Sequence, residues 1–203
     1  MVTEFAPFGN LENLMRNNPD KPPTLQFRIK LMIDAGRGIQ YLHENGILHR
    51  DIKPDNFLIM SLDENVPVIC KLTDFGSARN INLLMTNMTF TKGIGTPAYM
   101  APEIINKQHY KTAADIYAFA IVMYEIFGWT DAFPKTLFRF PWQIADFVMN
   151  GYRPYHCDAI TPNLYNIIER SWCQKQNERL TIEDIVSCLE TELMKLNLKI
   201  VNL

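Results

Sequence analysis

Apolar positions recur at helical spacing along most of the chain, and this pattern predicts a mainly α-helical fold. The longest example begins after Thr24, a typical N-cap, and runs to about residue 45. Gly46 follows it and suits the left-handed position that ends a helix. The apolar face of this helix comprises Leu25, Ile29, Met32, Ile33, Gly36 and Ile39. Further helices are predicted over residues 10–17, 112–127, 142–149, 163–173 and 181–195.

The rest of the chain predicts little strand and one long loop. Residues 1–5 have the pattern of the end of a strand, and the proline-rich residues 17–23 predict a turn. Residues 57–60 and 68–72 are apolar and flank a polar turn, so we expect a small β-hairpin. Residues 74–103 are polar, and a loop of that length is usually a functional lid or switch. The expected fold is a helical bundle with a small hairpin between its helices.

Composition narrows the class of protein only slightly. A chain of 203 residues is long enough for one domain, and a net charge of -2 gives no sign of affinity for nucleic acid. The four cysteines are scattered, which favours reduced thiols in a cytoplasmic environment. The most apolar stretch, 113–129, is interrupted by Asp115 and Glu125. We therefore expect a buried core helix there and no membrane segment in this chain.

Two short segments carry the candidate chemistry. The first is the run His-Arg-Asp-Ile-Lys-Pro-Asp-Asn over residues 49–56, and the second is the Asp-Phe-Gly triplet that begins at Asp74. Phosphoryl transfer needs a carboxylate that orients the attacking hydroxyl, a cation that offsets phosphate charge, and oxygen ligands for Mg²⁺. Asp51, Lys53 and Asn56 can fill these three roles, and Asp74 can supply a second metal ligand.

These motifs and three others, in the same order, resemble the C-terminal lobe of a eukaryotic protein kinase. The others are Gly-Thr-Pro-Ala-Tyr-Met-Ala-Pro-Glu at 95–103, Asp-Ile-Tyr-Ala-Phe-Ala at 115–120, and Arg179. The likeness covers essentially the whole chain, and five ordered motifs are far more specific than one. Lys53 and the 95–103 run resemble the serine/threonine pattern, while the hinge and residues 113–117 lean toward the tyrosine-kinase-like branch. A tyrosine-kinase-like enzyme with serine/threonine specificity is therefore implied.

The resemblance implies a role for each matching residue. Asp51 would be the catalytic base, Lys53 would contact the γ-phosphate, and Thr96 would bridge the two. The cofactors implied are ATP and Mg²⁺, with Asn56 and Asp74 as the metal ligands. Near the adenine, Thr3 would be the gatekeeper, Glu4 and Ala6 would make backbone contacts, and Leu58 would lie beneath the ring. The other residues implied to contact the nucleotide are Lys53, Asp55, Asn56 and Asp74.

The resemblance also implies three features outside the nucleotide contacts. His49 and Phe75 would belong to the hydrophobic stack that aligns the two lobes. Glu103 and Arg179 would form a partly buried tie, although a surface pair is the alternative. We expect phosphorylation of the loop at Thr89 or Thr91, with Arg50 as the phosphate ligand, whereas ordinary solvated threonines remain the alternative. Packing in the core and in a long loop is expected, in preference to a docking patch, for Phe127, Trp129, Phe133, Phe138, Phe140 and Trp142.

Compared with the family pattern, the chain begins at the hinge. It has no Gly-rich phosphate loop, no strand lysine for the α/β-phosphates and no helix glutamate to pair with that lysine. We therefore expect one kinase domain over residues 1–203 that consists of the hinge and the C-terminal lobe. The complete protein is expected to transfer the γ-phosphoryl group of ATP to serine or threonine hydroxyls of proteins in signal transduction. The alternative is a binding module or inactive fragment. The expected partners are a protein substrate and either the missing lobe or a covering protein, in the cytoplasm or on the cytoplasmic side of a membrane receptor.

Overall fold

The computed structural model describes residues 4–80, 97–108 and 111–201. Its described part is mainly helical, as the sequence pattern predicted. The α-helices are α1 (Leu11–Asn17), α2 (Leu25–Glu44), α4 (Pro102–Ile105), α5 (Thr112–Gly128), α6 (Pro141–Met149), α7 (Pro162–Ser171) and α8 (Ile182–Val201). Short 3₁₀ turns are η1 (Pro54–Asn56), η2 (Phe75–Ser77), η3 (Pro97–Tyr99) and η4 (Gln176–Glu178). The strands are β1 (Ile47–Leu48), β2 (Phe57–Ile59), β3 (Cys70–Leu72) and β4 (Arg79–Asn80).

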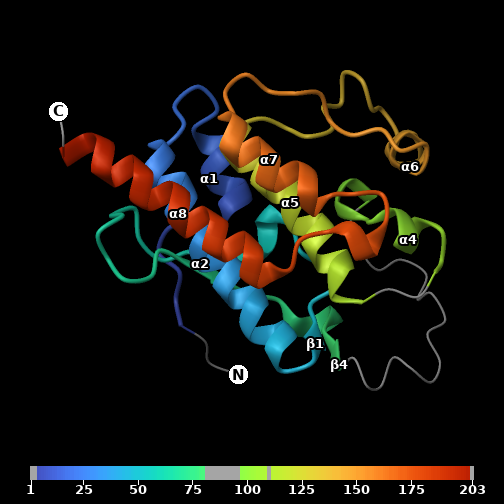
Figure 1. Ribbon diagram of the computed structural model, residues 1–203, viewed down its shortest axis with the longest axis horizontal. Helices are drawn as coiled ribbons and strands as arrows, with labels where there is room; N and C mark the ends of the chain where they lie inside the picture. The colour runs from blue at the N-terminus through green and yellow to red at the C-terminus, as the bar shows by residue number, and fades with distance from the viewer. Residues whose placement is uncertain (1–3, 81–96, 109–110, 202–203) are drawn as a thin grey trace.

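Helix α5 forms the centre of the core, and every residue from Asp115 to Phe127 on it is buried. Such a helix has no polar face, because neighbouring elements cover it on all sides. Helix α2 packs against α5 and α8, and α7 packs against both α5 and α8. Figure 1 shows α2, α5, α7 and α8 as a bundle, with β1 and β4 below it and α6 to its upper right.

Two of the predicted helices, α1 and α2, begin at a side-chain cap. The side-chain oxygen of Asn10 accepts a hydrogen bond from the backbone N–H of Asn13, and Thr24 accepts one from Phe27. Gly46 has φ of 68°, which confirms the left-handed residue expected after α2. Helix α8 runs to residue 201, several residues beyond the predicted end at 195.

The strands form two separate antiparallel pairs. The predicted hairpin is confirmed as β2 and β3, in which Phe57 faces Leu72 and Ile59 faces Cys70. The second pair joins β1 to β4 and was not predicted. Strand β4 lies within the segment 74–103 that was expected to be one long loop, and so do η2 and η3, while α4 begins at the end of that segment. Strand β4 has only two residues, both exposed and polar, so its pairing leaves no apolar pattern in the sequence.

Two other predictions were wrong or only partly correct. Glu4 and Phe5 are in no strand, and residues 1–3 lie outside the described part of the chain. Packing in the core or in a loop was expected for six aromatic residues, and four of them are buried or half-buried. Phe127 and Phe133 are buried and Trp129 and Phe138 are half-buried, whereas Phe140 and Trp142 are exposed. Among the helices that the structure describes, none is long and apolar enough to cross a membrane.

Candidate active site

The carboxylate of Asp115, in the first turn of α5, holds the start of the 49–56 loop. Its two oxygens accept hydrogen bonds from the backbone N–H groups of His49 and Arg50, each at 2.9 Å. The ring of His43, on α2, lies 3.0 Å from one of these oxygens. Arg50 has φ of 72°, a left-handed conformation that a non-glycine residue adopts only where its surroundings enforce it. A buried carboxylate with three partners thus fixes the backbone from which the loop leaves.

Three of the predicted site residues meet within this loop. Asp51 Oδ2 accepts a hydrogen bond from Lys53 Nζ at 2.8 Å and another from Asn56 Nδ2 at 3.3 Å. The same Asn56 amide also donates to the backbone carbonyl of Asp51 at 2.6 Å. Turn η1 reverses the chain so that Asn56 lies back against Asp51. The side chains of Asp51 and Lys53 are 14% and 22% exposed. The ion pair is therefore mostly buried, but part of it is still accessible to solvent.

The Asp-Phe-Gly triplet is tied to the loop through His49, which is fully buried. One ring nitrogen of His49 lies 2.9 Å from the carbonyl oxygen of Thr73, and its ring meets Phe75 edge-on at 5.7 Å. Asp74 has φ of 62°, and its carboxylate accepts a hydrogen bond from the N–H of Gly76 at 3.3 Å. The contact expected between His49 and Phe75 is therefore present. Asp74 itself is exposed.

The donor set suits a magnesium ion shared with a phosphate. Asn56 uses its amide nitrogen to hold Asp51, which leaves its side-chain oxygen as a candidate ligand. The N–H of Thr73 donates to the carbonyl of Asn56 at 2.9 Å, which places Asp74 on the neighbouring segment. Mg²⁺ in such sites takes one or two protein oxygens and completes its shell with phosphate and water. Among the described residues, no group of three or more His, Cys, Asp or Glu side chains is arranged to hold a metal ion.

The residues predicted to contact the adenine end lie beside the hairpin. Leu58, on β2, is half-buried and forms an antiparallel bridge with Asn10. Glu4 forms an exposed ion pair with Lys71, which is the cross-strand neighbour of Leu58. Ala6 is half-buried, and its carbonyl closes the turn that follows. The segment before α1 therefore runs alongside the hairpin, and the proposed contacts of these residues with adenine stay predictions.

The remaining predicted site residues are either exposed or outside the described part of the chain. Asp55 lies on η1 and is exposed, so its side chain points away from the buried Asn56. Thr3 and Thr96 lie outside the described residues, and the same holds for the candidate phosphorylation sites. Their expected roles stay predictions.

The predicted tie between Glu103 and Arg179 is confirmed and is buried. Two guanidinium nitrogens of Arg179 each lie 2.7 Å from a different oxygen of Glu103, in a fork-to-fork pair. Arg179 also donates to the carbonyl oxygens of Ala113 and Cys173, at 2.7 and 2.9 Å. Its guanidinium lies 5.1 Å from the centre of the Tyr117 ring. This cluster connects α4 to α5 and to the segment before α8.

A second buried carboxylate connects α5 to η3. The hydroxyl of Tyr99 donates a hydrogen bond to Glu125 Oε2 at 2.9 Å, and the N–H of Ala132 lies 3.2 Å from Oε1. Burial raises the pKa of Glu125 to about 8, and the two hydrogen bonds lower it only in part. The pKa of Tyr99 is also raised, first by burial and then by the neighbouring Glu125. The segment around η3 is thereby fixed to the central helix.

Sequence reasoning missed the roles of Asp115, Glu125 and His43. Glu125 counted only as an interruption of an apolar stretch. Asp115 was noted as another interruption and as the first residue of the 115–120 motif, and His43 had no assigned partner. A usable signal was present, because carboxylates inside a helix that is otherwise buried need hydrogen-bond donors. The sequence alone could not name those donors, since two of them are backbone N–H groups of a distant loop.

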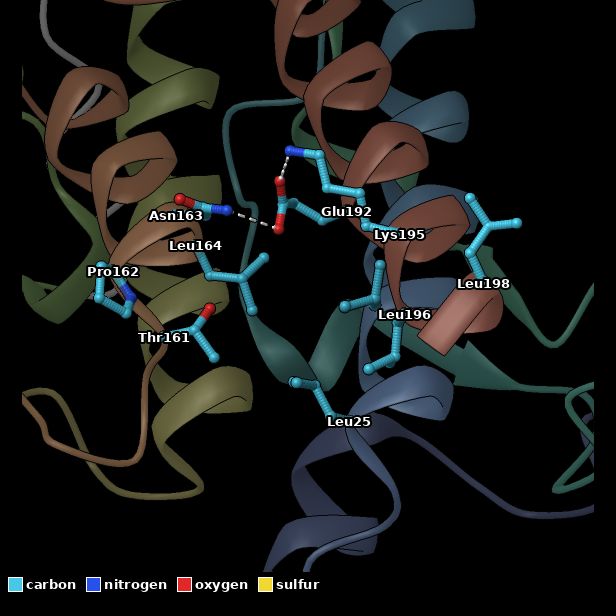
Figure 2. Close-up of a pocket in the computed structure, with 10 residues that line it drawn as sticks. Leu25, Thr161, Pro162, Asn163, Leu164, Glu192, Lys195, Leu196 and Leu198 are labelled. Atoms are coloured by element: carbon cyan, nitrogen blue, oxygen red, sulfur yellow. Dashed lines mark hydrogen bonds and ion pairs between the residues drawn. The ribbon is translucent and has the colours of Figure 1, made fainter. Parts of the chain in front are cut away.

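A pocket of about 480 Å³ lies between α2, α7 and α8, apart from this site. Figure 2 shows its apolar lining and, above it, Asn163 and Lys195 both reaching Glu192, at 3.0 and 2.7 Å. Leu25 and Ile29 line it from the first turns of α2, whereas the 49–56 loop follows the other end of that helix. Helix α2 is about 30 Å long, so the pocket is not part of the proposed nucleotide site.

The helical bundle and the grouping of Asp51, Lys53 and Asn56 match the arrangement expected for phosphoryl transfer. The family model described as protein tyrosine and serine/threonine kinase matches residues 1–189. Among similar proteins of Dictyostelium discoideum, "Probable serine/threonine-protein kinase gdt9" is 32% identical over 85% of this chain. "Probable serine/threonine-protein kinase gdt4" is 34% identical over 96% of it.

The chain therefore belongs to the protein tyrosine and serine/threonine kinase family. The matched region is 12% of the length of each of these two relatives. Members of this family generally use ATP and Mg²⁺. The resemblance seen in the sequence motifs is confirmed by the family match and by the mainly helical fold.

Proposed function

We propose that the protein containing this chain is an ATP- and Mg²⁺-dependent kinase that phosphorylates serine or threonine hydroxyls of proteins. The observation that supports it most is the contact of one carboxylate, Asp51, with both Lys53 and Asn56. That carboxylate lies in a loop whose backbone is held by a buried acid, Asp115. Geometry fixed before the substrate arrives is the main contribution that a protein makes to phosphoryl transfer.

Each residue has a part in this proposal. Asp51 orients the substrate hydroxyl and accepts its proton as the oxygen attacks. Lys53 offsets the negative charge that develops on the transferred group, and Thr96 bridges Asp51 and Lys53. Asn56 and Asp74 hold Mg²⁺, which neutralises phosphate charge when bound. Thr3, Glu4, Ala6 and Leu58 contact the adenine end of the nucleotide.

We propose, further, that an N-terminal lobe or a covering protein packs over the nucleotide site. Phe75 is 53% exposed and Phe8 is 44% exposed, both beside the segments that would contact the nucleotide. Large apolar side chains gathered at a functional site favour a further packing partner. We expect the 203-residue chain alone to be weak or inactive for the same reason.

The test is Asp51→Asn in the full-length protein, assayed by phosphate transfer from ATP to a mixed serine and threonine peptide library. Loss of the general base is expected to lower kcat by about 10²- to 10⁴-fold, with the fold retained by circular dichroism. Asp20→Asn is the matched control, because Asp20 is exposed in the turn before α2. Undiminished transfer by the Asp51 variant would refute the proposed role.

A further inference from the structure

One face of helix α2 lies along strand β3, the strand that leads to Asp74. Asp34 and Gly38, one helical turn apart on that face, both meet the segment 69–72. We propose that Asp34 and Gly38, together with Lys30, position the magnesium ligand Asp74 through β3. These three α2 residues are called the β3-facing side of α2 below. The inference rests on the proposed function, because it concerns a metal ligand that the proposed function assigns.

Asp34 holds the start of this segment through a buried hydrogen bond. Its side chain is 2% exposed, and its Oδ2 accepts a hydrogen bond from the backbone N–H of Ile69 at 2.7 Å. Lys30, one turn earlier on α2, donates to Asp34 Oδ1 at 3.1 Å and to the carbonyl oxygen of Pro67 at 2.7 Å. A buried carboxylate needs such partners. Asp34 and Lys30 together therefore fix residues 67–69 against α2.

Gly38 allows a close approach at the other end of the segment. A Cβ atom at this position would lie 3.2 Å from the Cβ of Leu72, closer than side chains normally pack. Glycine inside a helix is less favourable than alanine, so its presence within the 20-residue α2 fits a need for this close contact. The two attachments are about 6 Å apart along the helix axis. Asp74 follows Leu72 after one intervening residue.

The partner strand β2 has a support of its own. The N–H of Ile59 donates to the carbonyl oxygen of Gly9 at 2.8 Å, and Leu58 forms its bridge with Asn10. The segment before α1 therefore holds the strand that carries the proposed adenine contact, whereas α2 holds the strand that leads to the metal ligand. A change on the β3-facing side of α2 should consequently weaken metal binding and leave adenine binding unchanged.

Magnesium makes the placement of β3 important. Mg²⁺ demands near-octahedral geometry, with ligand distances of about 2.0–2.1 Å. Asn56 lies on the turn before β2 and Asp74 follows β3, so the separation of the two proposed ligands depends on how the two strands are placed. Loss of a group that orients a metal ligand typically lowers metal affinity by about 10- to 100-fold. We expect an effect at the lower end of that range from a small displacement of β3.

The test measures how much Mg²⁺ tightens nucleotide binding by the full-length protein. A non-hydrolysable ATP analogue is titrated by calorimetry with Mg²⁺ and again with EDTA, and the ratio of the two dissociation constants is the magnesium gain. Gly38→Ala is expected to lower this gain about tenfold, with the affinity for adenosine unchanged. Because alanine favours a helix, this variant should unfold at a denaturant concentration equal to or above that of the natural protein.

Gly36→Ala is the matched control on the same helix. A Cβ atom at Gly36 would lie 2.8 Å from a methyl group of Val186 on α8, and residues two apart do not share a face of a helix. This variant should unfold at a lower denaturant concentration and keep the full magnesium gain. Asp34→Ala should lower the gain at least as much as Gly38→Ala. Asp34→Asn should restore part of it, because an amide oxygen can still accept the hydrogen bond from Ile69.

The pattern across the variants decides between positioning and general loosening of the helix. A lower gain in Gly38→Ala with the full gain in Gly36→Ala supports the positioning role, even if Asp34→Ala does not fold. The full gain in Gly38→Ala overturns the positioning role alone. An equal loss in Gly36→Ala and Gly38→Ala also overturns it, because the placement of β3 would not be the cause. If Mg²⁺ does not tighten binding by the natural protein, the proposed function is overturned as well.

Discussion

Protonation of Glu125 should make the stability of this protein depend on pH. The carboxyl group lies within the core, on the central helix α5. Burial raises its pKa from 4.5 to about 8, while hydrogen bonds from Tyr99 and Ala132 act in the opposite direction. At neutral pH, the native protein therefore holds this proton, whereas the unfolded chain has released it.

The sign and the size of the effect follow from that difference. An acid with a raised pKa in the native state contributes stability below the pKa of the unfolded chain, and it loses this contribution as pH rises through the native pKa. The window here runs from about pH 4.5 to about pH 8. At about 1.4 kcal/mol for each pH unit, the free energy of unfolding should fall by up to about 5 kcal/mol across it.

Glu125→Gln removes the titration and keeps the shape. Glutamine is uncharged, like the protonated acid, and can bond to both Tyr99 and Ala132. In chemical denaturation from pH 5 to pH 9, we expect the variant and the natural protein to be similar at the acid end. The variant should become the more stable of the two as pH rises. Exposed Glu183→Gln serves as the control, and two parallel stability curves for the Glu125 variant would refute the reasoning.

Two other buried carboxylates give further predictions. Asp115→Asn presents an amide N–H₂ group to one of the loop N–H donors, so we expect a stability loss of about 1–3 kcal/mol in chemical denaturation and a lower kcat in the transfer assay. Unchanged kcat would contradict the anchoring role of Asp115. Glu103→Gln leaves the buried guanidinium of Arg179 without its counter-charge and should cost about 3–5 kcal/mol, again by denaturation. A cost below about 1 kcal/mol would show that the pair behaves like one exposed at the surface.

Much of the fold could be predicted because its signals are local. Thr24 and Gly46 mark the ends of α2 by capping chemistry, and the apolar spacing between them predicts its buried face. The hairpin was predictable from two short apolar runs around a polar turn. Strand β4 was not, since it is held by backbone pairing with β1 and its two side chains are exposed.

The candidate site also has one part that could be predicted from the sequence and another that could not. The spacing of Asp51, Lys53 and Asn56 was sufficient to predict their grouping, because they lie on one short loop. The partners of Asp115 and Glu125 depend on how separate elements pack, and no local pattern encodes that. The exposure of Trp142 also depends on packing, since its sequence neighbours include aromatic residues that are half-buried.

Helix α5 provides a common frame for the 49–56 loop and η3. Its first turn holds the 49–56 loop through Asp115, and its second half holds η3 through Glu125. Both attachments use buried carboxylates on a helix that is enclosed by the core, so neither can move without repacking. The separation of the two attachment points, which lie ten residues or about 15 Å apart along α5, is therefore set by helix geometry.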